Sequence, residues 1–104
     1  MNQVIFSEIQ SLKRQILPNE RLILFGSQAR GDAREDSDWD LVVLLNKEKA
    51  NFNEDHDNYA FPFTELGWDY GVAITTLVYG KEQWEKGKNF PFFRNIKREG
   101  IEIK

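Results

Sequence analysis

The chain has 104 residues, of which 40% are hydrophobic and 13% aromatic, enough apolar material for one folded domain over residues 1–104. It has no cysteine, which excludes disulfide scaffolds and thiolate metal sites, and no apolar run that could span a bilayer. Because the sequence also lacks a signal-peptide pattern at its N-terminus, we expect a soluble, cytoplasmic domain. The net charge of −3 argues against nonspecific nucleic-acid binding.

Apolar residues at three- and four-residue spacings predict a first helix with one apolar stripe, formed by Val4, Ile5, Ile9, Leu12 and Ile16. Pro18 should end this helix. Residues 21–25 form a short apolar run that predicts a strand stopped by Gly26. A polar loop with one helical turn should follow, and the apolar residues 39–45 predict a strand covered on both faces.

The second half of the chain predicts further helices and one more strand. Residues 51–69 carry a helical pattern that Pro62 should kink or delay. Residues 71–79 are rich in β-branched side chains and predict a strand, and residues 81–86 predict a short helix. A last helix is expected over 91–98, capped by Asn89 and ended by Gly100. Its predicted core face consists of Phe92, Phe93 and Ile96. This order indicates an α+β or α/β sandwich with a small mixed sheet.

The negative charge is concentrated between residues 30 and 40, since acids and bases balance in the rest of the chain. Asp38 and Asp40 stand two residues apart at the start of a predicted strand, so both side chains leave the same face. Their carboxylates could converge on one or two hard cations. Two anions beside an apolar strand are costly unless a metal compensates them, and oxygen ligands favour Mg²⁺ or Mn²⁺ over zinc.

A second feature lies at the beginning of the same segment. Gly26 and Ser27 directly follow a predicted strand, and a glycine there lets the backbone approach a ligand closely. Backbone N–H groups and the Ser27 hydroxyl could then hold phosphate oxygens. A phosphate cradle facing a carboxylate pair is the combination of groups that metal-assisted phosphoryl or nucleotidyl transfer requires.

Residues 26–41 follow the pattern G-S-x-A-R-G-x5-S-D-x-D-L. This pattern resembles the signature of the minimal nucleotidyltransferases of the DNA polymerase β superfamily. The resemblance implies the nucleotidyltransferase fold, a small mixed β-sheet flanked by helices in the α+β class. It also implies transfer of a nucleoside monophosphate from an NTP, with ATP favoured, to an acceptor hydroxyl with two Mg²⁺ ions. The sequence does not name the acceptor.

The same resemblance assigns roles to five residues. Asp38 and Asp40 would be the catalytic, metal-binding carboxylates, and Gly26 and Ser27 would hold the triphosphate. Arg30 would contact a phosphate or would instead pair with a neighbouring acid. The implied partner is a helical protein of the HEPN type, in a toxin–antitoxin pair, or a second copy of the chain.

The chain departs from the family at the third carboxylate, which lies on an adjacent strand in that family. Ala73 stands where an acid is expected after Gly71-Val72, and Asp69 lies before the strand. Two hypotheses therefore stay open. The chain is an active nucleotidyltransferase, or it is a weakly active or inactive nucleotide-binding module that acts as an antitoxin or partner-binding protein.

Other residues of the polar stretches have simpler interpretations. An EF-hand is excluded because Leu41 and Lys47 stand where that loop needs Gly and Glu. Ser37 is interpreted as a turn residue, Trp39 as packing on the sheet face opposite the carboxylates, and His56 as a surface residue. The remaining acids of the segment are interpreted as a solvated loop: Asp32, Glu35 and Asp36.

Overall fold

A four-stranded mixed sheet forms the centre of the fold, in the order β3-β2-β1-β4. The strands are β1 (Arg21–Phe25), β2 (Trp39–Leu45), β3 (Ile74–Gly80) and β4 (Ile101–Ile103). β1 is antiparallel to both β2 and β4, whereas β2 and β3 are parallel. This computed structural model describes residues 1–34 and 37–104, and Glu35 and Asp36 lie outside the described residues.

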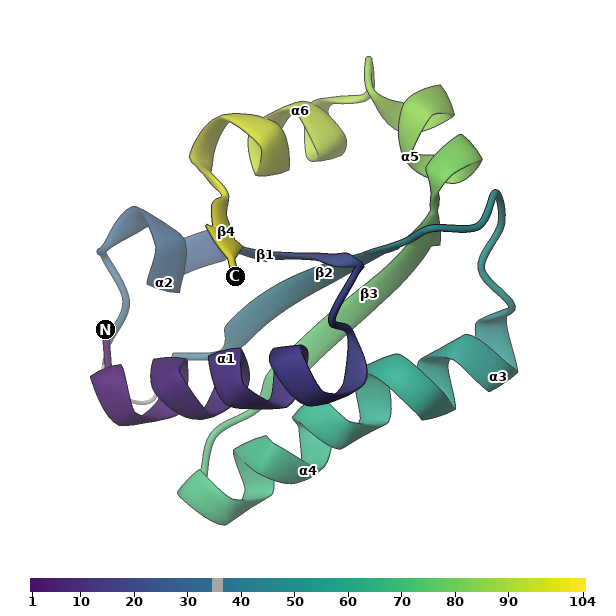
Figure 1. Ribbon diagram of the computed structural model, residues 1–104. Helices are drawn as coiled ribbons and strands as arrows, with labels where there is room; N and C mark the ends of the chain where they lie inside the picture. The colour runs from purple at the N-terminus through teal and green to yellow at the C-terminus, as the bar shows by residue number, and fades with distance from the viewer. Residues whose placement is uncertain (35–36) are drawn as a thin grey trace.

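Helices cover both faces of the sheet (Figure 1). α1 (Gln3–Ile16) and α4 (Phe61–Tyr70) lie on one side, and α5 (Lys81–Gly87) and α6 (Pro91–Glu99) lie on the other. The short helix α2 (Gly26–Arg30) directly follows β1, and α3 (Phe52–Asp55) leads through a π-helical turn (His56–Ala60) into α4. The predicted α+β fold with helices on a small mixed sheet is therefore confirmed.

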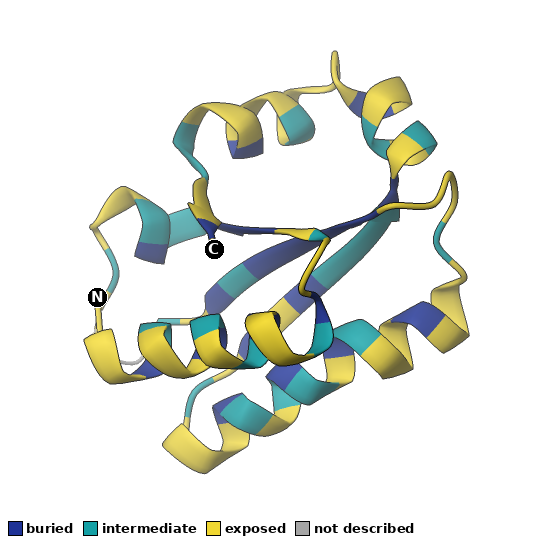
Figure 2. Ribbon diagram, viewed as in Figure 1, coloured by how far each residue is buried: buried dark blue, intermediate teal, exposed yellow. Residues whose placement is uncertain are grey.

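β2 is buried along nearly its whole length (Figure 2). Its side chains alternate between two apolar layers, as a strand buried on both faces requires. One layer packs against α1 and α4 and includes Trp39, Leu41, Val43 and Leu45. The other packs against α6 and includes Val42 and Leu44. Trp39 is buried in the first layer, so the prediction that it packs opposite the carboxylates is confirmed.

Several boundaries differ from the prediction for local physical reasons. β3 begins at Ile74 rather than at residue 71, because Gly71 takes a left-handed conformation that ends α4. Phe90, not Asn89, precedes the first turn of α6, and no side chain caps that turn. The predictions that Pro91 starts this helix and Gly100 ends it are confirmed.

The sequence analysis did not predict β4 or the π-helical turn (His56–Ala60). β4 has only three residues, too few for a period of two to be recognised, and its pairing with β1 defines it. Pro62 lies in the first turn of α4, after the π-helical turn, so the start of this α-helix is delayed, which is one of the two effects predicted for the proline. No helix within residues 1–34 and 37–104 is long and apolar enough to cross a membrane.

Candidate active site

The two ends of the 26–41 segment meet at one end of the sheet. Phe25, the last residue of β1, is the register partner of Asp40 on β2, so the turn into α2 lies beside the start of β2. Gly26 has φ +74°, and a Cβ built on it would overlap Asp40 Oδ2. The glycine therefore permits a close approach between the proposed phosphate cradle and the proposed metal ligand.

Asp40 stands on the sheet face that carries α6, because it alternates with the buried Trp39 and shares its face with Val42. Asp38 lies just before the strand, close enough for its charge to act on Asp40. Asp38 is exposed and Asp40 is half-buried. Burial raises the pKa of the Asp40 carboxyl above its ordinary value, the negative charge of Asp38 raises it further, and the Arg30 guanidinium opposes both effects. None of the ion pairs among the described residues involves either carboxylate.

The raised pKa of Asp40 predicts a pH-dependent cost to stability. The folded chain holds this proton more tightly than the unfolded chain, so stability is lost as the pH rises from the ordinary pKa of 3.8 through the raised value. In EDTA, Asp40→Asn should melt at a higher temperature than the wild type at pH 7, and the difference should shrink toward pH 4. Thermal melts across this range measure the effect.

Asp69→Asn is the matched control, because this acid is exposed at the end of α4. Its melting temperature at pH 7 should match that of the wild type, because substitutions of exposed residues change stability little. Equal melting of Asp40→Asn and the wild type at pH 7 would contradict the predicted cost.

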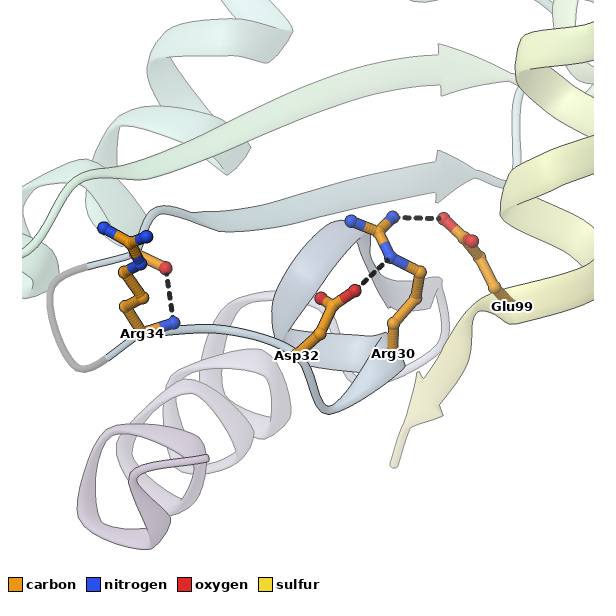
Figure 3. Close-up of polar contacts among 5 residues, drawn as sticks. Arg30, Asp32, Arg34 and Glu99 are labelled. Carbon is orange, nitrogen blue, oxygen red and sulfur yellow. Dashed lines mark hydrogen bonds and ion pairs between the residues drawn. The ribbon is translucent and has the colours of Figure 1, made fainter.

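Arg30 is held between two acids in this structure (Figure 3). Its Nε lies 3.3 Å from Asp32 Oδ2, and its Nη1 lies 3.2 Å from Glu99 Oε1 at the end of α6. The hydrogen bond and charge of Asp32, with a smaller contribution from Glu99, raise the pKa of the guanidinium. The interpretation in which Arg30 pairs with a neighbouring acid describes this arrangement, and the phosphate contact stays a prediction.

Gln28 has a role that the sequence analysis missed. It is buried, and its Nε2 donates a hydrogen bond of 3.2 Å to the backbone oxygen of Ser37. Ser37 Oγ in turn accepts a bond of 2.8 Å from the backbone N–H of Arg34, as expected of a turn residue (Figure 3). Gln28 therefore ties α2 to the chain just before Asp38. It occupies an unspecified position of the motif, so no signal in the sequence marked it.

The pairing of β3 with β2 shows which residues of β3 lie beside the two carboxylates. Thr75 is the partner of Asp40 on the parallel neighbour strand, and Ala73 lies two residues earlier, where its backbone oxygen accepts a bond from Trp39. Thr75 is exposed on the face that carries Asp40. Neither position holds an acid. The described residues contain no group of three or more His, Cys, Asp or Glu side chains that could hold a metal ion together.

The residues present nevertheless fit a divalent cation with oxygen ligands. Burial and the charge of Asp38 both disfavour the ionised form of the half-buried Asp40, and a cation between the two carboxylates would offset both effects. Both ligands are carboxylates, which suits Mg²⁺ or Mn²⁺ and disfavours zinc. The remaining ligands would have to come from water or from the phosphates of a nucleotide.

A cavity of about 180 Å³ lies elsewhere, at the free edge of β3. Phe52 and His56 line it together with Thr76, Leu77, Val78 and Tyr79. His56 is exposed and stacks on Phe52, so the prediction of a surface histidine is confirmed. No lining residue of this cavity comes from the 26–41 segment, and it is not part of the candidate active site.

Comparison with known proteins adds evidence of a different kind. Residues 7–100 match the family model described as "Nucleotidyltransferase domain". "Putative protein adenylyltransferase MJ0604" of Methanocaldococcus jannaschii is 37% identical over 81 residues, covering 78% of this chain and 74% of the relative. "Putative protein adenylyltransferase MJ0141" of the same organism is 29% identical over 89 residues, covering 81% and 78%.

A solved structure has the same fold. It is described as "Crystal structure of the toxin-antitoxin with AMP-PNP", and it superposes on the whole of this chain and 73% of its own with a TM-score of 0.65. The sequence identity is 17%, so this likeness concerns the fold alone.

Proposed function

The chain belongs to the nucleotidyltransferase domain family, and on that basis we propose that it transfers a nucleoside monophosphate from an NTP, with ATP favoured, to a hydroxyl group of an acceptor. The observation that carries the proposal is the contact of Gly26 with Asp40. Gly26 and Asp40 lie together at one end of the sheet because of the β1–β2 register, and this supports a phosphate cradle beside a carboxylate pair.

The residues of the site divide into two groups with different tasks in this reaction. Ser27 and the backbone at Gly26 hold the triphosphate, and Asp38 and Asp40 hold the divalent cation. Mg²⁺ bound there would neutralise phosphate charge and polarise the α-phosphate. The acceptor oxygen bonds to the α-phosphorus, the bond to the bridging oxygen breaks, and pyrophosphate leaves with the electron pair. The acceptor's proton passes to solvent water.

The acceptor we propose is a protein hydroxyl, because the two curated relatives bear the name of protein adenylyltransferases. The exposure of Asp38 and Thr75 leaves the carboxylate side of the sheet open to a macromolecule. The proposed acceptor is either a helical partner protein or a second copy of the chain. Incubation with ATP labelled at the α-phosphate and Mg²⁺, with and without a candidate partner, should produce a labelled protein band. Release of pyrophosphate should match the label incorporated.

A second candidate function is a nucleotide-binding module with little or no transfer, acting as an antitoxin or partner-binding protein. The observation that favours it is the absence of an acid at both Ala73 and Thr75, opposite the carboxylate pair. The loss of one general base costs about 10²–10⁴-fold in rate. Under this function, ATP and Mg²⁺ bind but label transfer stays at background with every acceptor.

Restoring an acid at the position beside Asp40 tests whether the missing carboxylate limits transfer. We expect Thr75→Asp to raise the transfer rate at least about tenfold, because its carboxylate would stand beside Asp40 and could accept the acceptor's proton. Label incorporation under single-turnover conditions measures the change.

Ala73→Asp and Thr75→Asn are the matched controls. The asparagine has nearly the same size as the aspartate but no charge, so it should leave the rate unchanged. A rate increase in Ala73→Asp with none in Thr75→Asp would place the missing carboxylate at the earlier position instead.

A further inference from the structure

Helix α6 presents one face to the candidate active site. Phe92, Ile96 and Glu99 are spaced four and three residues apart, so they share a helix face. Ile96 is buried against β1 and β2, and Glu99 reaches Arg30 on α2. Phe92, in the first turn of the same helix, packs edge-to-face on Phe25 with ring centroids 5.8 Å apart. α6 therefore lies along the β1 side of the site.

This packing covers only part of Phe92. The residue remains 45% exposed, although Phe25 and Phe93 both contact its ring edge-to-face. Exposure alone does not mark a ligand site, because Phe52, Trp68 and Phe90 are more exposed. What distinguishes Phe92 is its contact with Phe25, the residue directly before Gly26. The sequence analysis assigned Phe92 to the core face of the helix, and the structure corrects that assignment because the residue is exposed.

The sheet register places this ring beside the proposed phosphate and metal groups. Phe25, Asp40 and Thr75 are successive partners across β1, β2 and β3, so their side chains leave the same face in one row. Gly26, at the head of the proposed cradle, follows Phe25 directly and contacts Asp40. A nucleotide whose phosphates lie at Gly26 and Asp40 thus has Phe92 at one end of the row and the polar Thr75 at the other.

We infer that Phe92 is the stacking platform for the nucleobase of the bound NTP. A nucleobase is the apolar, flat part of this ligand, and every base has a face that can stack on an aromatic ring. The packing of Phe92 on Phe25 orients the ring, which lowers the entropy cost of binding. This inference rests on the proposed function, since it requires an NTP at the Gly26–Asp40 site.

The test compares two ligands that share their phosphates. Wild type should bind MgATP more tightly than magnesium tripolyphosphate, which has no base. In Phe92→Ala the affinity for MgATP should fall roughly 5- to 100-fold, the effect of losing one base–aromatic stack, while tripolyphosphate affinity stays the same. Phe92→Leu keeps an apolar side chain for packing but has no ring, so it should lose the same preference. Phe92→Trp should retain it.

Phe61→Ala is the matched control. Phe61 is 41% exposed and also packs edge-to-face on one aromatic ring at 5.8 Å, but it lies on α4, across the sheet from α6. Its substitution should leave both affinities unchanged. Unchanged ATP affinity in Phe92→Ala and Phe92→Leu, or an equal loss for both ligands, would overturn the inference alone. Failure of wild type to bind either ligand would overturn the proposed function with it.

Discussion

Asp38→Asn and Asp40→Asn are each expected to lower Mg²⁺-dependent transfer of the α-phosphate label at least about hundredfold. Both changes keep the size of the side chain and remove its charge. The loss should therefore come from the missing compensation of cation and phosphate charge rather than from altered packing. Label incorporation, measured with the same acceptor for all variants, gives the rates.

Folding controls for these two variants come from the structure. Asp40→Asn removes a half-buried charge whose pKa is raised by burial, so this variant should be at least as stable as the wild type without metal. Asp32→Asn alters an exposed acid of the same segment that pairs with Arg30, and it should retain most of the activity. Full transfer activity in Asp40→Asn would contradict the assignment of this residue.

Gly26→Ala should abolish nucleotide binding and transfer, and it should also destabilise the fold. The alanine would have to keep φ near +74°, a strain of about 1–2 kcal/mol, and its Cβ would overlap Asp40 Oδ2. The chain can relieve the overlap only by moving α2 or the carboxylate, and either movement separates the two halves of the site. Calorimetric titration with MgATP and a thermal melt measure the two effects.

Gly31→Ala is a control that introduces backbone strain without an overlap between the added Cβ and a neighbouring residue. Gly31 ends α2 with φ +80°, so an alanine there meets a similar backbone strain, but a Cβ would have nothing within 4 Å. This variant should lose stability and retain nucleotide affinity. Equal affinities for MgATP in Gly26→Ala and Gly31→Ala would show that the contact between Gly26 and Asp40 has no part in binding.

The sequence was sufficient to predict the parts of the fold that depend on local pattern. The apolar spacing of α1, the two-sided burial of β2 and the glycine that ends α6 all follow from side-chain period and backbone chemistry. β4 did not, because three residues show no period, and only its pairing with β1 makes it a strand.

The candidate site was predictable as a set of residues but not as an arrangement. The motif marked Gly26 and Asp40, whereas their contact depends on the antiparallel register of β1 and β2. The sequence indicated a missing acid at Ala73, and that assignment stays a prediction, but counting along one strand cannot show which residue lies beside Asp40. The parallel pairing with β2 identifies Thr75 as the residue beside Asp40. Phe92 shows the same limit, since helical spacing does not reveal how much of a side chain its neighbours cover.

The most direct test of the metal–nucleotide site is equilibrium binding of α,β-methylene-ATP. Nucleotidyl transfer cannot break the bond between its α-phosphorus and the bridging carbon. Binding should be saturable and dependent on Mg²⁺, and it should be lost in EDTA and in the double variant Asp38→Asn with Asp40→Asn. This outcome is expected whether the chain is an active transferase or a binding module. Equal affinity with Mg²⁺ and with EDTA, or in the double variant and the wild type, would contradict the site.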